Sequence, residues 1–254
     1  MASNTSGTTF VLVPGAWHST SAFKPMAELL KAAGYNVQTI DLASCGSEPP
    51  VEDLQPDVHL ISSAVEEAAD KGQNVVVFMH SYGGIVGTES CRGLGKKERE
   101  ASGKKGGVVE LIYCCAFMVE EGVSIMDMLG NQPLPWFVVS DDGARLSPST
   151  PETIFYNDLS HEEAQRYTRT LRHHSYHCLK AKLTYPAYKY IHTTYLYCTK
   201  DNAIILPVQE KMVEDTRKMG AYVDTVTLEA SHSPYLSMPD QVVAACCMAI
   251  GDSL

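Results

Sequence analysis

The chain has 254 residues, of which 44% are hydrophobic and 20% charged, and its formal net charge is −10 at pH 7. This length suits one large α/β domain or two small ones, and the acidic excess disfavours nucleic acid as a partner, because phosphate binding needs a basic face. No run of 18 apolar residues exists and the start MASNTSGTT is polar, so we expect neither a membrane span nor a signal peptide.

The first half of the chain alternates between apolar runs and amphipathic segments. The apolar run at 74–80 is continuous, which is typical of a parallel strand covered on both faces. The segment KKEREASGKKGG at 96–107 mixes bases with acids, and we interpret it as a solvated surface loop. The expected elements are, in chain order, a strand at 8–15, a helix at 22–34, a strand at 35–42, a helix at 56–72, the strand at 74–80 and a helix that begins near Ser81.

The same alternation continues in the second half, after one long interruption. Strands are expected at 107–117, 190–198 and 221–230, and helices at 207–220 and 239–252. The whole pattern predicts an α/β fold with a mostly parallel six-stranded sheet and helices on both faces. Such sheets bind ligands beyond the carboxyl ends of their strands, so the residues that follow each strand are the candidates for a site.

The interruption covers residues 118–188, and we predict that it forms a cap over the carboxyl ends of the strands. The core would then consist of residues 1–117 and 189–254. Within the cap, the run FVVSDDGARL predicts a small hairpin, because Asp-Gly is a strong turn signal between apolar residues. A helix is expected from Ser160, which forms the capping-box pattern with Glu163.

The eight cysteines lie in strand-like and helical runs, and no C-x-x-C pair exists. We therefore expect buried, reduced thiols in a cytoplasmic protein, and no cysteine-based zinc site. A second metal alternative is the group His173, His174, His177 and Cys178. No carboxylate lies at ligand spacing there, and histidines after a helix have an ordinary role at the helix dipole. No metal and no cofactor are expected.

The strand at 74–80 runs into the sequence HSYGG, in which Ser81 is followed by two glycines. A strand, a tight turn with small residues and a helix form the context of a nucleophile elbow, which aims the serine hydroxyl above the sheet. The alternative is that Ser81 only caps the helix, since serine is a preferred N-cap residue. Met79 stands where the common G-x-S-x-G pattern has glycine, and we expect its side chain to pack away from the helix.

A serine hydroxyl is a weak nucleophile and needs a base and a group that orients the base. His232 follows the last expected strand and Asp201 follows the strand before it, in the order Ser, Asp, His that α/β-hydrolases have. Glu120 or Glu121, after the strand at 107–117, is the alternative acid. His80 is a neighbour of the serine in sequence, so it is expected to pack beside the elbow.

The oxyanion hole is expected to consist of backbone N–H groups. One donor is Tyr82, the residue after the serine. The other lies in the loop after the first strand, where Pro14 has no N–H. Ala16 is the predicted donor in this loop, and Trp17 is the alternative.

Four motifs, FVLVPGAWH, MHSYGG, CTKD and SHSPYLSMP, together resemble the α/β-hydrolase superfamily, and more narrowly its compact branch of plant methyl esterases, hydroxynitrile lyases and bacterial or fungal esterases. The resemblance spans almost the whole chain. It implies a catalytic triad of Ser81, His232 and Asp201, with Ala16 and Tyr82 as the oxyanion donors.

The chain departs from that branch at several positions. Pro14 stands where the family often has histidine, and Met79 replaces the first glycine of the elbow. Lyase members carry a lysine directly after the triad histidine and a threonine in the oxyanion loop, where this chain has Ser233 and Gly15. The residues that distinguish the lyases are therefore missing, whereas those of the hydrolases are present.

The sequence predicts a serine hydrolase that cleaves a small carboxylic ester or lactone through an acyl-enzyme. Trp17, Met118 and Trp136 are the candidate substrate-binding residues. One alternative is a lyase, dehydratase or cyclase in a small-molecule biosynthetic pathway that uses the same three groups. Another is a non-catalytic ligand-binding protein on the same scaffold. The oligomeric state stays open, with a homodimer as one alternative.

Overall fold

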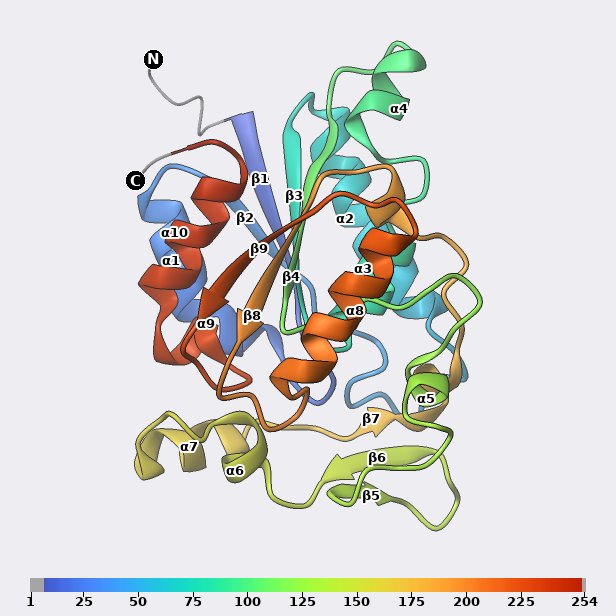
Figure 1. Cartoon of the computed structure of the whole chain (residues 1–254), viewed down its shortest axis with the longest axis vertical. Helices are drawn as coiled ribbons and strands as arrows, with labels where there is room; N and C mark the ends of the chain where they lie inside the picture. The colour runs from blue at the N-terminus through green and yellow to red at the C-terminus, as the bar shows by residue number, and fades with distance from the viewer. Residues whose placement is uncertain (1–6, 253–254) are drawn as a thin grey trace.

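A computed structural model of the chain describes residues 7–252. Six parallel strands form its central sheet, in the order β2-β1-β3-β4-β8-β9 (Figure 1). The inner strands β3 and β4 are almost fully buried, as expected for continuous apolar runs covered on both faces. The predicted fold class is confirmed. The strands are β1 (Thr8–Val13), β2 (Asn36–Thr39), β3 (Asn74–His80), β4 (Gly107–Cys114), β8 (Thr193–Cys198) and β9 (Val223–Leu228).

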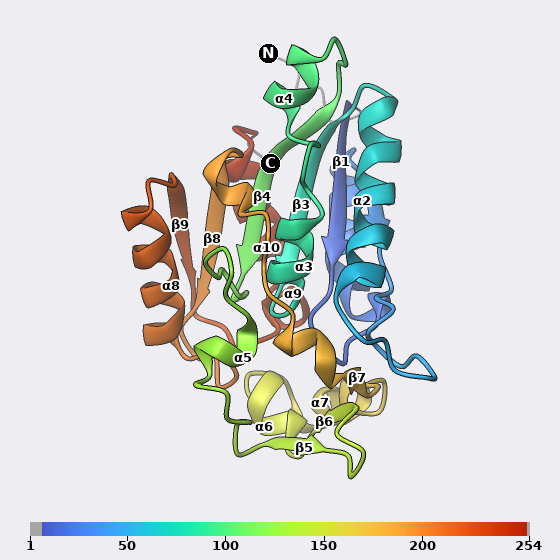
Figure 2. The same cartoon turned by 90° about the vertical axis from the view of Figure 1, so that its right-hand side faces the viewer.

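Helices cover both faces of the sheet, and alternate residues of each strand point to opposite faces (Figures 1 and 2). Val11 and Val77 pack in the layer under α2, α3 and α8, whereas Leu12 and Phe78 pack under α1 and α10. No helix within residues 7–252 is both long and apolar enough to cross a membrane. The helices of the core are α1 (Lys24–Ala32), α2 (Gln55–Asp70), α3 (Gly83–Glu89), α4 (Lys96–Ala101), α8 (Leu206–Lys218), α9 (Pro234–Ser237) and α10 (Pro239–Ala249), with short 3-10 turns η2 (Thr20–Phe23) and η4 (Ala187–Lys189).

Most of residues 118–188 lie below the carboxyl ends of the strands, at the bottom of Figures 1 and 2, and the last part of the segment runs back along α3, where Thr184 N–H and Tyr185 N–H donate to the Glu89 carboxylate. We call this segment the cap. It contains a small antiparallel sheet in the order β5-β6-β7, of which β5 and β6 form the expected hairpin. The capping box of α7 is present, because Glu163 N–H donates to Ser160 Oγ at 3.3 Å. The elements are α5 (Ile125–Met128), β5 (Phe137–Val139), β6 (Arg145–Pro148), α6 (Pro151–Phe155), α7 (His161–Thr168), β7 (His174–Ser175) and the 3-10 turn η3 (Tyr176–Lys180).

The expectation of a solvated surface loop at 96–107 is right for the exposure of most of the segment but wrong for its conformation. Half of this segment forms α4, and Arg99 within it is buried. Arg99 Nε donates to the carbonyl of Gly106 at 2.7 Å, and its Nη2 contacts the carboxylate of Asp70 at 2.5 Å. A mixture of charges in sequence indicates a surface, but it does not show which arginine buries its stem and pairs its head group.

The expectation that Met79 packs away from the following helix is also wrong. Met79 is fully buried against α3, where a Cβ added to Gly87 would lie 2.6 Å from its Cγ and Sδ atoms. The glycine that makes room for the helix therefore stands on the helix itself. In the common elbow pattern the glycine stands on the strand.

Candidate active site

Ser81 lies at the junction between β3 and α3, with a φ of 52° in the left-handed region, where non-glycine residues are uncommon. Its backbone is held on two sides, because its N–H donates to Cys114 O at 3.4 Å and its carbonyl accepts from Phe117 N–H at 3.0 Å. The side chain makes no capping hydrogen bond to α3, whose N-cap residue is Tyr82. The alternative of a helix cap is therefore not supported, and the local geometry is that of an elbow.

The glycines after the serine let the elbow approach the neighbouring strands. A Cβ on Gly83 would lie 2.7 Å from the carbonyl oxygens of Val13 and Pro14, and one on Gly84 would collide with the carbonyl of Phe117. Any larger residue would push α3 away from the sheet. These contacts explain the two consecutive glycines.

His232 and Asp201 form a buried pair at the ends of adjacent strands. His232 Nδ1 and Asp201 Oδ2 are 2.7 Å apart. The other carboxylate oxygen of Asp201 accepts the N–H groups of Ala203 and Ile204, at 2.7 and 2.9 Å. Gln209 Nε2 lies 3.3 Å from Oδ2, so four groups fix the orientation of the carboxylate. With Nδ1 engaged, Nε2 is the ring nitrogen left to act on a neighbouring group.

The alternative acids are placed elsewhere, because Glu120 and Glu121 are exposed on the surface. His80 packs beside the elbow, as expected. Its Nε2 lies 2.7 Å from the carbonyl oxygen of His232, and its ring centroid lies 4.6 Å from that of His232. Burial lowers the pKa of His80 well below its ordinary value, so the ring is neutral and donates this hydrogen bond.

The loop that carries the predicted oxyanion donors passes close to the elbow. A Cβ on Gly15 would lie 2.8 Å from both Ser81 Cβ and His80 Nδ1. Within residues 7–252, the backbone N–H groups of Ala16 and Tyr82 have no acceptor in the protein. Two unpaired donors beside one serine are the arrangement that a developing oxyanion needs.

Ser81, His232 and the loop meet at one small cavity of about 30 Å³, which has room for no more than one or two water molecules. Trp17 and Trp136, two of the candidate substrate-binding residues, line it, and no charged side chain does. Met118 does not line it, because this residue is buried in the core with its N–H facing Met212 Sδ at 3.4 Å. The lining residues are Ala16, Trp17, Ser81, Tyr82, Phe117, Ile125, Leu134, Trp136, Phe137, Leu179, Ala203, Ile204 and His232.

The prediction from sequence missed two side chains that hold the predicted oxyanion donors. The Tyr82 hydroxyl donates to Asp57 Oδ2 at 2.9 Å, and burial raises the pKa of this carboxyl group. His18 Nδ1 lies 2.7 Å from the carbonyl of Ala16, and its Nε2 lies 2.9 Å from the Tyr156 hydroxyl. Burial lowers the pKa of His18 to about 4, so the ring is neutral, donates to the loop and accepts from the tyrosine. The partners Asp57 and Tyr82 are 25 residues apart and His18 and Tyr156 are 138 residues apart, so the sequence contains no local signal for these two contacts.

All eight cysteines are buried and none is in a disulfide. Among residues 7–252, two groups bring three donor atoms within 4.8 Å of one another. They are His80, Cys115 and His232, and the cysteines Cys114, Cys115 and Cys198. Neither is the group in the cap that the sequence suggested as a metal alternative. Of that group, His174 is fully buried and neither of its ring nitrogens has a partner. Burial lowers its pKa to about 3.

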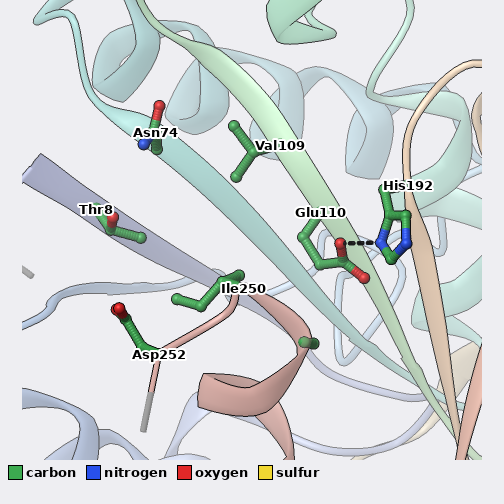
Figure 3. A pocket seen from close by; sticks show the side chains of 8 residues that line it. Thr8, Asn74, Val109, Glu110, His192, Ile250 and Asp252 are labelled. Atoms are coloured by element: carbon green, nitrogen blue, oxygen red, sulfur yellow. Dashed lines mark hydrogen bonds and ion pairs between the residues drawn. The ribbon is translucent and has the colours of Figure 1, made fainter. Parts of the chain in front are cut away.

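A larger hollow of about 470 Å³ lies at the opposite end of the sheet, where strands β1, β3 and β4 begin (Figure 3). Its lining includes Asn74, Glu110, His192 and Asp252. Glu110 Oε2 lies 2.6 Å from His192 Nδ1, and its other oxygen accepts from Thr194 at 2.8 Å. This hollow is larger than the cavity beside Ser81, but it is not the candidate active site, because none of the predicted catalytic residues lines it.

Comparisons with known proteins agree with the fold described above. The model of the alpha/beta hydrolase family matches residues 10–245. An alpha/beta hydrolase from Aspergillus novofumigatus is 30% identical over 247 residues, which cover 96% of this chain and 97% of that protein. A probable hydrolase from a Phoma species is 27% identical over 236 residues, covering 91% and 93%. The crystal structure of a pyrethroid hydrolase from Sphingobium faniae superposes with a TM-score of 0.74 at 22% identity, covering 95% and 96%. The resemblance inferred from the motifs is confirmed.

Proposed function

The chain belongs to the alpha/beta hydrolase family, and on that premise we propose that it is a serine hydrolase that cleaves a small, uncharged carboxylic ester or lactone. The observation that carries the proposal is the buried pair of His232 and Asp201, of which His232 lines the same cavity as Ser81. The fungal relatives that match over nearly the whole chain are named as hydrolases, which supports the same reading.

In the proposed reaction, His232 Nε2 takes the proton of the Ser81 hydroxyl as the oxygen attacks the carbonyl carbon. Asp201 holds the imidazole in the required orientation and stabilises its charged form. The N–H groups of Tyr82 and Ala16 bind the oxyanion of the tetrahedral intermediate. His232 then protonates the leaving alcohol, and water attacks the acyl-enzyme in a second cycle that releases the acid and restores Ser81.

The cavity lining supports the substrate class. Its side chains are aromatic or aliphatic apart from Ser81, His232 and the phenol of Tyr82, which is engaged by Asp57. A charged group placed there would lose its hydration without a partner, which is costly. The proposed substrate is therefore neutral and apolar around the reacting carbonyl.

The experiment is to label the folded protein with a fluorophosphonate and to identify the modified residue by mass spectrometry. The label is expected on Ser81, together with loss of hydrolysis of a p-nitrophenyl ester. Ser81→Ala should abolish both, whereas Ser63→Ala, at an exposed serine on α2, should change neither. A folded protein that hydrolyses no ester and takes up no label at Ser81 would overturn the proposal.

The lyase, dehydratase or cyclase alternative uses the same three side chains, so labelling alone does not separate it from hydrolysis. Turnover in oxygen-18 water does, because hydrolysis places the label in the carboxylate product. A product without water-derived oxygen would favour the alternative. The non-catalytic alternative requires that Ser81→Ala leaves ligand binding intact in a protein that turns over no substrate.

A further inference from the structure

Trp17 follows the predicted oxyanion donor Ala16 and has a φ of 68°, in the left-handed region that favours glycine. A bulky residue keeps such a conformation only where its surroundings fix it. The peptide that joins Ala16 to Trp17 borders the cavity, so the conformation of Trp17 bears on how the loop presents its N–H groups.

The contacts that fix Trp17 come from the cap. The indole Nε1–H donates to the carbonyl of Leu146 on β6 at 2.8 Å, and the Trp17 carbonyl accepts from Arg172 N–H at 3.0 Å. The indole stacks on Phe155, with centroids 5.4 Å apart and planes 25° apart. Its other aromatic neighbours, Trp136, Phe137 and His174, also belong to residues 118–188.

The same part of the cap reaches the loop of the predicted base. Phe155 is fully buried between the two loops, and its ring centroid lies 5.6 Å from that of His232. The carbonyl of Phe155 accepts from Ser231 Oγ at 3.1 Å, and Asp158 Oδ2 accepts from Ser231 N–H at 2.8 Å. One segment at the end of α6 thus contacts the oxyanion loop on one side and the histidine loop on the other.

The cavity ties this arrangement to substrate entry. Leu134, Trp136 and Phe137 of the cap line the cavity of about 30 Å³, which is too small for an ester with an apolar group on each side. A substrate enters only when these side chains move. Two of them, Trp136 and Phe137, contact the Trp17 ring edge-on, with centroids 5.6 and 5.9 Å away.

We propose that Trp17 is a positioning residue that couples the cap to the oxyanion hole, so that the loop presents its N–H groups only when the cap is seated. The inference rests on the proposed function, because it assigns the reaction to the same cavity. Opening the cap for entry weakens the restraints on the strained Trp17 backbone. When the cap closes over the bound ester, its contacts to Trp17 through Leu146, Phe155 and Arg172 form again, while the side chains that line the cavity stay displaced by the ester. The chemistry therefore begins only after closure.

The first test is Trp17→Phe, which keeps an aromatic ring against Phe155 but removes the indole donor to the Leu146 carbonyl. Removing one oxyanion donor outright costs about 10²–10³ in kcat, so loosening the loop is expected to lower kcat about 10-fold with KM little changed. The rate of fluorophosphonate labelling of Ser81 should fall by a similar factor, because phosphonylation uses the same hole. Tyr167→Phe on α7 is the control in the cap and should leave kcat, KM and the labelling rate unchanged.

The second test uses fluorescence, since Trp17 and Trp136 are the only two tryptophans. In Trp136→Phe, all tryptophan emission comes from Trp17. Labelling Ser81 with a long-chain fluorophosphonate, which exceeds the cavity, should shift this emission to longer wavelength as the cap is displaced. A short methyl phosphonate, which displaces fewer of the side chains that line the cavity, should cause a smaller shift.

Three results would overturn the inference. Trp17→Phe could keep both kcat and the labelling rate, or it could raise KM alone, which would mean that Trp17 only binds substrate. The emission of Trp17 could also stay constant while the long-chain probe labels Ser81. Each variant is compared with the unmodified protein. If the proposed function itself were wrong, the unmodified protein would not be labelled at Ser81, so the two failures can be told apart.

Discussion

Lowering the pH from 7.5 to 5 is expected to destabilise the fold through histidines that are neutral and buried. Burial lowers the pKa of His18 to about 4 and that of His174 to about 3, from an ordinary value of 6.5, and it lowers that of His80 well below this value. Between pH 6.5 and the folded-state values, the unfolded chain binds more protons than the folded one. The contribution of these neutral histidines to stability is therefore full above about pH 6.5 and is lost progressively as the pH falls from 6.5 towards their folded-state pKa values.

The magnitude follows from the linkage relation. At pH 5, an unfolded histidine is almost fully protonated, whereas His18 and His174 are still largely neutral in the fold. Each therefore lowers the free energy of unfolding by about 2 kcal/mol relative to pH 7.5, since one pKa unit corresponds to about 1.4 kcal/mol. Burial raises the pKa of Asp57 and Glu110, which favours the fold as the pH falls and offsets part of this loss.

The assay is urea unfolding followed by circular dichroism at several pH values between 7.5 and 5. His174→Leu removes the contribution of one histidine to the pH dependence. The ring nitrogens of His174 have no partner, so the substitution leaves no hydrogen bond unmade. The variant is expected to lose about 2 kcal/mol of the pH dependence. His59→Gln, at an exposed histidine on α2, should keep all of it. A His174→Leu protein with the full pH dependence would refute the assignment of a neutral, buried ring.

Three further predictions concern single side chains. Asp201→Asn should lower kcat by about 10⁴, because the amide no longer holds the His232 tautomer. A kcat that falls less than tenfold in folded protein, measured by esterase kinetics, would contradict this. Met79→Gly should lower the free energy of unfolding by about 3 kcal/mol or more, because it leaves a cavity and makes the strand more flexible, and it should keep kcat. An unchanged urea midpoint would count against the packing described. Glu110→Ala removes the acceptor of His192 and should lower the free energy of unfolding by about 1–3 kcal/mol in the same assay, while ester turnover is retained. Lost turnover in folded protein would instead indicate a functional role for this end of the sheet.

The sheet and the three candidate catalytic residues could both be predicted from the sequence, because both follow from the order of the parallel strands. Parallel strands place whatever follows them at one edge, so the order of Ser81, Asp201 and His232 along the chain brings them together without any knowledge of packing. The 2.7 Å contact between His232 and Asp201 follows from the adjacency of β8 and β9. The capping box of α7 is local and could be read in the same way.

Side-chain packing across elements could not be predicted in this way. Met79 needs space near the elbow, and the sequence does not show that Gly87 on the facing helix supplies it. Met118 follows β4 after Cys115, whose φ of 37° turns the chain and changes the direction in which later side chains point. The alternation of a regular strand therefore does not extend to Met118, and its side chain lies in the core.

The geometry of the oxyanion loop could not be predicted from the sequence, because it depends on contacts with the cap. The elbow and the acid-base pair take their geometry from the strands, whereas the loop after β1 takes its geometry from Leu146, Phe155 and Arg172, more than a hundred residues away. The residues that enclose the substrate are thus in contact with the residue that shapes the oxyanion hole. Substitutions of the cap residues that contact Trp17 should then change kcat as well as KM, because binding and assembly of the site use the same contacts. Cap variants of Phe155 test this most directly, since its ring touches Trp17 and His232 at once.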